Sequence, residues 1–180
     1  MRGIPNAITL LRLLLTPVIA TLLAERYYVA GFVIYVFAAL SDGLDGYLAR
    51  RFNVTSRVGA LLDPVADKLI VICASFALAW QGLLPLWVAI PLIARDALML
   101  GVGVTDPRLQ NGWLPPNPAG KLHAALAFLT IIATIAQAAG LFDAQWLLMV
   151  LYAVLLASLA ISSGLYFAAW RRFRARAART

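Results

Sequence analysis

Six apolar segments, separated by short polar connections, occupy most of this 180-residue chain. Hydrophobic residues make up 63% of the sequence and charged residues 13%, whereas soluble domains average about 45–50% and about 25%. A single water-facing core cannot hide so much apolar side chain, so we expect an all-α integral membrane protein. The segments cover residues 8–23, 27–40, 68–80, 84–104, 122–139 and 145–170.

The second and third segments are too short to cross a bilayer alone. Their fourteen and thirteen residues make helices of about 21 Å and about 20 Å, against a hydrocarbon core of about 30 Å. Each helix is therefore expected to continue into the polar stretch 41–67, with residues 53–56 forming a short turn. Part of this polar stretch would then lie at membrane depth.

Positive charges alternate between the two ends of the predicted helices. Eleven of the fifteen Lys and Arg residues lie in the N-terminus, the connections 41–67 and 105–121, or the tail 171–180, and only Arg26 lies in the other connections. Cytoplasmic loops carry the excess of Lys and Arg. We therefore predict six transmembrane helices in an inner or plasma membrane, with both termini cytoplasmic. No nucleic-acid partner is expected, because no extended basic patch interleaved with aromatic residues is present.

Four of the eight acidic residues fall within one stretch of 26 residues. Asp42 and Asp45 are three apart and Asp63 and Asp67 are four apart, so on helices each pair lies on one face. The short turn would bring the two pairs face to face across a helix hairpin. A charged side chain inside a membrane costs at least about 2.5–3.5 kcal/mol. The four acids are therefore expected to line a polar cavity open to the cytoplasm.

Four converging carboxylates repel one another unless cations compensate their charge. Two divalent ions would balance the four charges, and Mg²⁺ prefers oxygen ligands that it shares with substrate phosphates. Two such ions suit displacement at phosphorus, because they stabilise the entering and the leaving oxygen. Zinc is not expected, since His123 and Cys73 are the only residues of their types.

Other interpretations of the acids stay open. Intramembrane acids also serve ion or proton transporters, although those are expected along a route through several helices. Salt bridges to Arg50, Arg57 and Lys68 would neutralise some of the charge. A non-catalytic lipid-binding scaffold is a third alternative.

Small residues accompany the acids. Gly46 and Ala49 share the helix face of Asp42 and Asp45, and Gly59 comes four residues before Asp63. A missing or short side chain lets a ligand or a second backbone approach closely. The face is therefore predicted to dock a ligand, and tight helix–helix packing is the alternative.

The spacing of these residues resembles the signature of the CDP-alcohol phosphotransferase family. The signature runs from Asp42 through Arg50 and on to Gly59, Asp63 and Asp67. Residues 4–12 and 56–68 are similar to the phosphatidylglycerophosphate synthase and CMP-forming cardiolipin synthase branches. The resemblance implies one transmembrane domain over residues 1–170 and a basic tail over 171–180. It also implies a homodimer that transfers a phosphatidyl group from CDP-diacylglycerol to an alcohol and releases CMP.

The resemblance further implies roles for individual residues. Asp42, Asp45, Asp63 and Asp67 would hold two Mg²⁺ or Mn²⁺ ions. Asp67 would also be the base that takes the proton from the acceptor hydroxyl. The residues implied to contact the CDP group are Asn6, Thr9, Gly46, Ala49, Arg50 and Gly59.

Glycerol 3-phosphate is the favoured acceptor, and phosphatidylglycerol is the alternative. An anionic acceptor needs cations, for which Arg12, Arg95 and Lys121 are the candidates. Adjacent residues on a helix do not face each other, so Arg95 and Asp96 are expected to have separate partners. Arg95 would either bind the acceptor or pair with the aspartate cluster. The tail 171–180 would set the orientation in the membrane or bind anionic lipid.

Overall fold

The computed structural model describes residues 4–52, 57–105 and 118–177, with side chains described at 9–41, 65–101, 118–169 and 171. Within these ranges the fold is all-helical, with six helices and no strand. The helices are α1 (Ile4–Ala24), α2 (Tyr28–Phe52), α3 (Arg57–Trp80), α4 (Leu86–Thr105), α6 (Pro118–Ala138) and α7 (Gln145–Ala177).

The expected extension of the two short apolar segments is confirmed. α2 has 25 residues and runs past the positions of Asp42 and Asp45, and α3 has 24 residues and begins ten residues before Asp67. Helices of this length extend for about 36 Å, which is enough to cross a hydrocarbon core of about 30 Å. The predicted turn at 53–56 lies outside the described residues.

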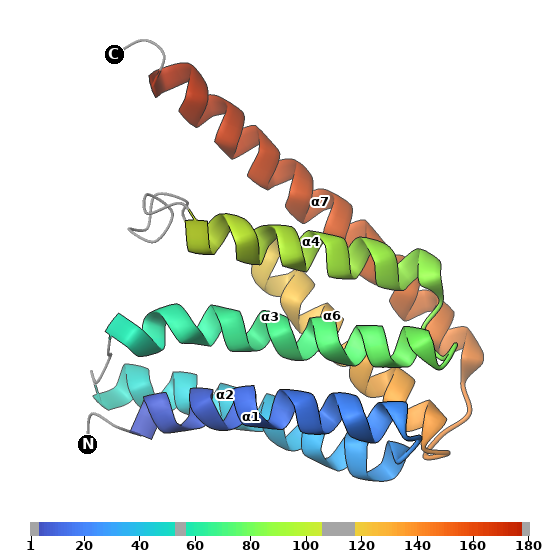
Figure 1. Cartoon of the computed structure of the whole chain (residues 1–180). Coiled ribbons are helices and arrows are strands. Elements are labelled where there is room, and N and C mark those ends of the chain that lie inside the picture. The colour runs from blue at the N-terminus through green and yellow to red at the C-terminus, as the bar shows by residue number, and fades with distance from the viewer. Residues whose placement is uncertain (1–3, 53–56, 106–117, 178–180) are drawn as a thin grey trace.

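Consecutive helices run in opposite directions (Figure 1). The beginnings of α1 and α3 and the ends of α2 and α4 lie at one end of the bundle, which we call the aspartate end. At the opposite end, α3 and α6 end two residues before Gly82 and Gly140, both with φ of 72°. Glycine adopts this left-handed conformation without steric cost, and it lets the chain reverse over a few residues.

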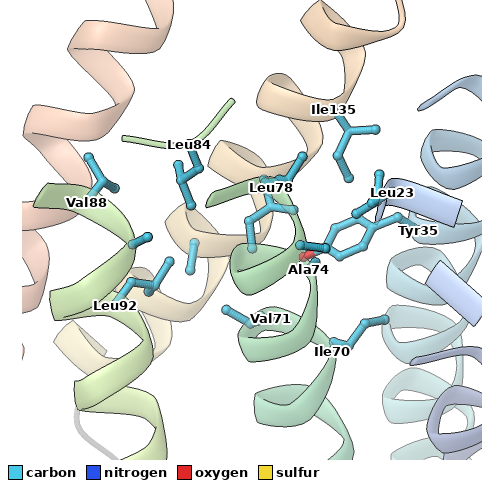
Figure 2. Packing of buried hydrophobic residues seen from close by; sticks show 14 of the residues in the cluster. Leu23, Tyr35, Ile70, Val71, Ala74, Leu78, Leu84, Val88, Leu92 and Ile135 are labelled. Atoms are coloured by element: carbon cyan, nitrogen blue, oxygen red, sulfur yellow. The ribbon is translucent and has the colours of Figure 1, made fainter. Parts of the chain in front are cut away.

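The two helices that carry the aspartates are joined through α1. α1 packs closely against both α2 and α3, whereas α2 and α3 are not among the closely packed helix pairs of the described residues. Tyr35 of α2 points toward Leu23 and Ala74 in the space between these helices (Figure 2), and all three side chains are buried. The Tyr35 ring thus fills space where α1, α2 and α3 meet. Whether the two aspartate pairs face each other stays a prediction.

The outer surface of the bundle is apolar. Leu14, Ile90 and Leu122 are exposed by 60% or more on three different helices, and they would face water in a soluble protein. Trp80 and Trp146, at the end opposite the aspartates, are 77% and 72% exposed, as expected for rings at a membrane interface. Such a surface fits contact with lipid better than contact with water.

By length and composition, two described helical stretches could cross a membrane, Pro118–Ala138 and Gln145–Ala169. Thr9–Ala24 and Tyr28–Ser41 are shorter apolar helices. α3 and α4 pass this test less well in part because they carry charged residues, and among the described side chains Lys68, Arg95 and Asp96 lie inside the bundle. These buried charges define the candidate site.

Candidate active site

The four motif aspartates lie toward the aspartate end of the bundle. Asp42 and Asp45 are in the second half of α2, and Asp63 and Asp67 are in the first half of α3. The side chains of Asp42, Asp45 and Asp63 fall outside the described ones. Among the side chains that are described, no group of three or more His, Cys, Asp or Glu gathers to hold a metal. The four-carboxylate cluster therefore stays a prediction.

Asp67 forms an ion pair with Arg12 of α1, whose side chain is 3% exposed. Thr9 and Thr16 are buried one turn before and one turn after Arg12, and the Thr16 hydroxyl donates to the Arg12 carbonyl at 2.8 Å. The three side chains share one face of the helix. α1 therefore presents a polar stripe to α3, and Arg12, predicted as an acceptor ligand, lies against the predicted base.

A second ionic cluster joins α3 to α4. The Asp96 carboxylate accepts from Lys68 Nζ at 2.7 Å and from Arg95 Nη1 at 2.6 Å. The Asp96 and Arg95 side chains are 3% and 8% exposed, and that of Lys68 is 22% exposed. Charges buried to this degree are stable only when they are paired.

The expectation of separate partners for Arg95 and Asp96 is wrong. Their Cβ atoms diverge on the helix, but the Arg95 side chain is long enough to bring its guanidinium back to the neighbouring carboxylate. Its other terminal nitrogen, Nη2, donates to Ser162 Oγ of α7 at 3.1 Å. Arg95 thus pairs with Asp96, and no pairing with the described motif acid, Asp67, is observed.

α6 packs closely on α7 beside this second ionic cluster. A methyl group at Gly120 would lie 3.1 Å from the Tyr166 hydroxyl, so glycine permits the approach. One turn further on, His123 is buried, and its Nδ1 lies 2.9 Å from Ser158 Oγ. Ser158 lies one turn before Ser162, the α7 residue that accepts from Arg95, so His123 and Arg95 contact the same face of α7. Four helices, α3, α4, α6 and α7, therefore contribute to one polar layer.

The described ionic groups of the two sites are the cations Arg12, Lys68 and Arg95 and the carboxylates Asp67 and Asp96. Inside a bundle, where water screens little, cationic side chains of this kind attract a negatively charged substrate group more strongly than they would at a surface.

The other predicted contacts lie apart or outside the described side chains. Lys121, at the beginning of α6, is exposed and makes none of the described ion pairs. Thr9 is buried on the Arg12 face of α1. The remaining predicted donor contacts have no described side chain, and they are Asn6, Gly46, Ala49, Arg50 and Gly59.

Sequence reasoning missed Ser162, Ser158 and the role of Lys68. A salt bridge from Lys68 to the motif acids was one open alternative, and the described ion-pair partner of Lys68 is Asp96. The sequence feature that could have identified them is the presence of polar residues within apolar segments. Ser158, Ser162 and His123 interrupt otherwise hydrophobic helices. Such residues usually face the interior of a membrane bundle.

Residues 2–162 match the CDP-alcohol phosphatidyltransferase family. The chain belongs to this family, as its aspartate spacing indicated. A CDP-diacylglycerol–glycerol-3-phosphate 3-phosphatidyltransferase of Pseudomonas fluorescens is 38% identical over 143 residues, covering 72% of this chain and 71% of that protein. A CMP-forming cardiolipin synthase of Streptomyces coelicolor is 37% identical over 121 residues, covering 63% and 55%.

A provisionally named cardiolipin synthase of Mycobacterium tuberculosis is 35% identical over 126 residues, which make up 69% of this chain. The chain spans 59% of that protein and 55% of the Streptomyces protein. The similarities therefore include both branches that the sequence suggested. They do not by themselves assign an acceptor.

Proposed function

We propose that this protein transfers a phosphatidyl group from CDP-diacylglycerol to glycerol 3-phosphate and releases CMP. The observation that carries the proposal is the placement of Asp67. The last acid of the family motif lies on the polar inner face of α3, paired with a buried arginine, and the next residue, Lys68, belongs to a second ionic cluster with Arg95 and Asp96. Cationic side chains at this place suit reactants that carry phosphate groups.

The residues fit hard divalent cations. The four motif carboxylates offer only oxygen ligands, and Asp67 already attracts one cationic partner, the Arg12 guanidinium. Mg²⁺ and Mn²⁺ prefer such ligands. We propose that Asp42, Asp45, Asp63 and Asp67 hold two of these ions. When bound, the ions would supply charge stabilisation at the diphosphate of the donor.

Asp67 is proposed as the general base. It takes the proton from a primary hydroxyl of the acceptor as that oxygen forms its bond to the phosphorus that carries the diacylglycerol. The bond from this phosphorus to the oxygen of CMP breaks, and CMP leaves with the electron pair. A carboxylate can act in this way if it lies within hydrogen-bond reach of the hydroxyl. Its 36% exposure leaves room for an acceptor to approach.

The donor is proposed to bind between α1 and the aspartate-bearing parts of α2 and α3. Thr9 is buried on the polar face of α1. Arginine suits a diphosphate because its planar guanidinium pairs with two oxygens at once, and Arg50 follows Asp45 by five positions on α2. The further proposed contacts are Asn6, Gly46, Ala49 and Gly59.

A second acceptor, phosphatidylglycerol, is supported by the relatives named cardiolipin synthase. Residues 98–104 contain no further arginine, and the described cations of the layer number three. Both acceptors are anionic glycerol compounds, so the layer suits either. Arg95, with Arg12 and Lys121, remains the proposed acceptor group.

We expect labelled glycerol 3-phosphate to enter a chloroform-soluble product when purified protein is given CDP-diacylglycerol and Mg²⁺. The same protein with labelled phosphatidylglycerol should give little cardiolipin. Thin-layer separation of the products distinguishes the two. Cardiolipin as the main product would assign the alternative acceptor, and no lipid product with either acceptor would refute the proposed transferase.

We propose six transmembrane helices, with both termini and the site on the cytoplasmic side of an inner or plasma membrane, and a homodimer. The antiparallel helices of Figure 1 and the alternation of Arg and Lys between successive connections in the sequence support this topology. Single cysteines placed at position 2 or 179 in a Cys73→Ala background should resist an impermeant thiol reagent in intact cells, and one at Arg26 should react. The reverse pattern would contradict the proposed orientation.

A further inference from the structure

Three helices, α1, α3 and α6, end on the side of the bundle away from the aspartates with the same backbone turn (Figure 1). Two residues after each helix the chain is left-handed, with φ of 66° at Arg26 and 72° at Gly82 and Gly140. The next residue then donates to a carbonyl five positions earlier, as Tyr27 does to Leu22 at 2.8 Å. Glycine usually occupies the left-handed position of such a turn. After α1 an arginine takes this place.

Arg26 is unfavourable at this position for two reasons. A residue with a Cβ strains the backbone at such a φ, because the Cβ crowds the following carbonyl oxygen. Arg26 is also the only Lys or Arg in the connections at this end of the bundle, where positive charges are depleted in membrane proteins. A residue kept in a strained backbone conformation points to a function of its side chain.

The Arg26 side chain is held in place from one side only. Its Nε donates to Gln81 Oε1 at 3.2 Å, and Gln81 Nε2 in turn donates to the Ala24 carbonyl. Among the described residues, the two terminal nitrogens of Arg26 have no hydrogen-bond partner, and the adjacent Glu25 forms no ion pair with it. Two free terminal nitrogens in one plane match two oxygens of a phosphate.

An apolar groove begins at Arg26. It has a volume of about 620 Å³ and follows the outer surface of the first two turns of α2, past Ala30, Val33 and Ile34. Val33 is 59% exposed, and Tyr27, beside the arginine, is 64% exposed. Tyrosine rings settle at the level of the lipid headgroups. The groove therefore has a cationic end at headgroup depth and an apolar course toward the middle of the bilayer.

We propose that this groove binds one phospholipid of the leaflet opposite the aspartates. The phosphate accepts from the terminal nitrogens of Arg26, and an acyl chain lies along α2 as far as Ile34. At about 1.5 Å per residue this part of α2 is about 10 Å long, which lies within the half-thickness of about 15 Å of the hydrocarbon core. Because Arg26 is bonded to Gln81, the lipid stabilises the contact between the α1–α2 and α3–α4 connections. The site is separate from the proposed transfer of phosphatidyl groups, whose residues lie toward the other end.

The test titrates dioleoylphosphatidic acid and dioleoylglycerol, which differ only in the phosphate, into purified protein in detergent micelles. The unfolding midpoint at each lipid concentration gives an apparent Kd. The unmodified protein should bind the phosphatidic acid at least about fivefold more tightly, as one arginine near a membrane surface provides. Arg26→Gly should reduce this preference by about the same factor. Its midpoint without lipid should not fall, because glycine adopts this φ without strain.

Arg26→Lys is the matched variant for charge. Lysine keeps the positive charge and the backbone strain but lacks the planar pair of nitrogens. Its preference for the phosphatidic acid should therefore lie between those of the unmodified protein and Arg26→Gly. CMP release should be unchanged in both variants, so a failure of the proposed transferase is measured separately.

Ala30→Leu tests the apolar part of the groove, and it keeps the inference testable if Arg26→Gly does not fold. The larger side chain fills the groove and should weaken the binding of both lipids. Ala160→Leu is the control, because Ala160 is exposed on α7 and does not line the groove.

Equal affinity for phosphatidic acid in the unmodified protein and folded Arg26→Gly would overturn the inference, as would unchanged binding of both lipids in Ala30→Leu. A change from dimer to monomer in Arg26→Gly, with lipid binding unchanged, would also overturn it and assign the groove to a second copy of the chain.

Discussion

Asp67→Asn is expected to lower phosphatidyl transfer by about 10²–10⁴-fold, the range that a general base contributes. The amide keeps the shape of the carboxylate but cannot take the proton of the acceptor hydroxyl. Initial rates of CMP release at saturating CDP-diacylglycerol and Mg²⁺ measure the effect. Metal-dependent binding of the donor should remain detectable, because three motif aspartates are unchanged.

The matched control is Asp143→Asn. Asp143 is exposed in the connection between α6 and α7, at the end away from the motif, and should tolerate the same chemical change. Asp67→Asn also removes the carboxylate partner of Arg12, so its unfolding midpoint in micelles should be measured beside the rate. Normal turnover in a folded Asp67→Asn protein would show that another group accepts the proton.

Asp96→Asn is expected to destabilise the bundle by about 3–5 kcal/mol, as breaking a buried ion pair does. Lys68 and Arg95 then lose their shared carboxylate, and two positive charges remain uncompensated among helices α3, α4 and α7. The midpoint of thermal unfolding of the purified protein in micelles checks this. Asp143→Asn again serves as the control with no expected shift.

A double variant separates the effect of the excess positive charge from the effect of the missing carboxylate. Lys68→Met combined with Asp96→Asn removes one charge of each sign and leaves the net charge of the cluster as it is in the unmodified protein. Its unfolding midpoint should lie above that of Asp96→Asn alone. Equal midpoints for the two variants would mean that the missing carboxylate, and not the excess charge, causes the loss.

The helices could be predicted because their causes are local. Apolar runs end at Gly82 and Gly140, and the shortness of two segments required α2 and α3 to extend through the motif. The family could be recognised for a similar reason, because the spacing from Asp42 to Asp67 lies in one continuous stretch. Both inferences need only the order of residues within one continuous stretch of sequence.

The partners of the buried charges could not be predicted, because they depend on which helices meet. Lys68 and Asp96 are 28 residues apart, and Arg12 and Asp67 are 55 apart. The rule that neighbours on a helix point apart failed for Arg95, since it describes Cβ directions and not the reach of a long side chain. Similarly, a predicted turn at 53–56 did not fix how closely α2 and α3 pack on each other, and among the described residues each of them packs closely on α1.

Release of CMP from CDP-diacylglycerol is the most direct test of the proposed activity. Purified protein in micelles should release CMP only when an alcohol acceptor and Mg²⁺ or Mn²⁺ are both present, with one CMP for each lipid product. A chelator should stop the reaction, and added Mg²⁺ should restore it. Absence of CMP with glycerol 3-phosphate, phosphatidylglycerol and other alcohols alike, or full activity in the presence of chelator, would contradict a metal-dependent phosphatidyltransferase.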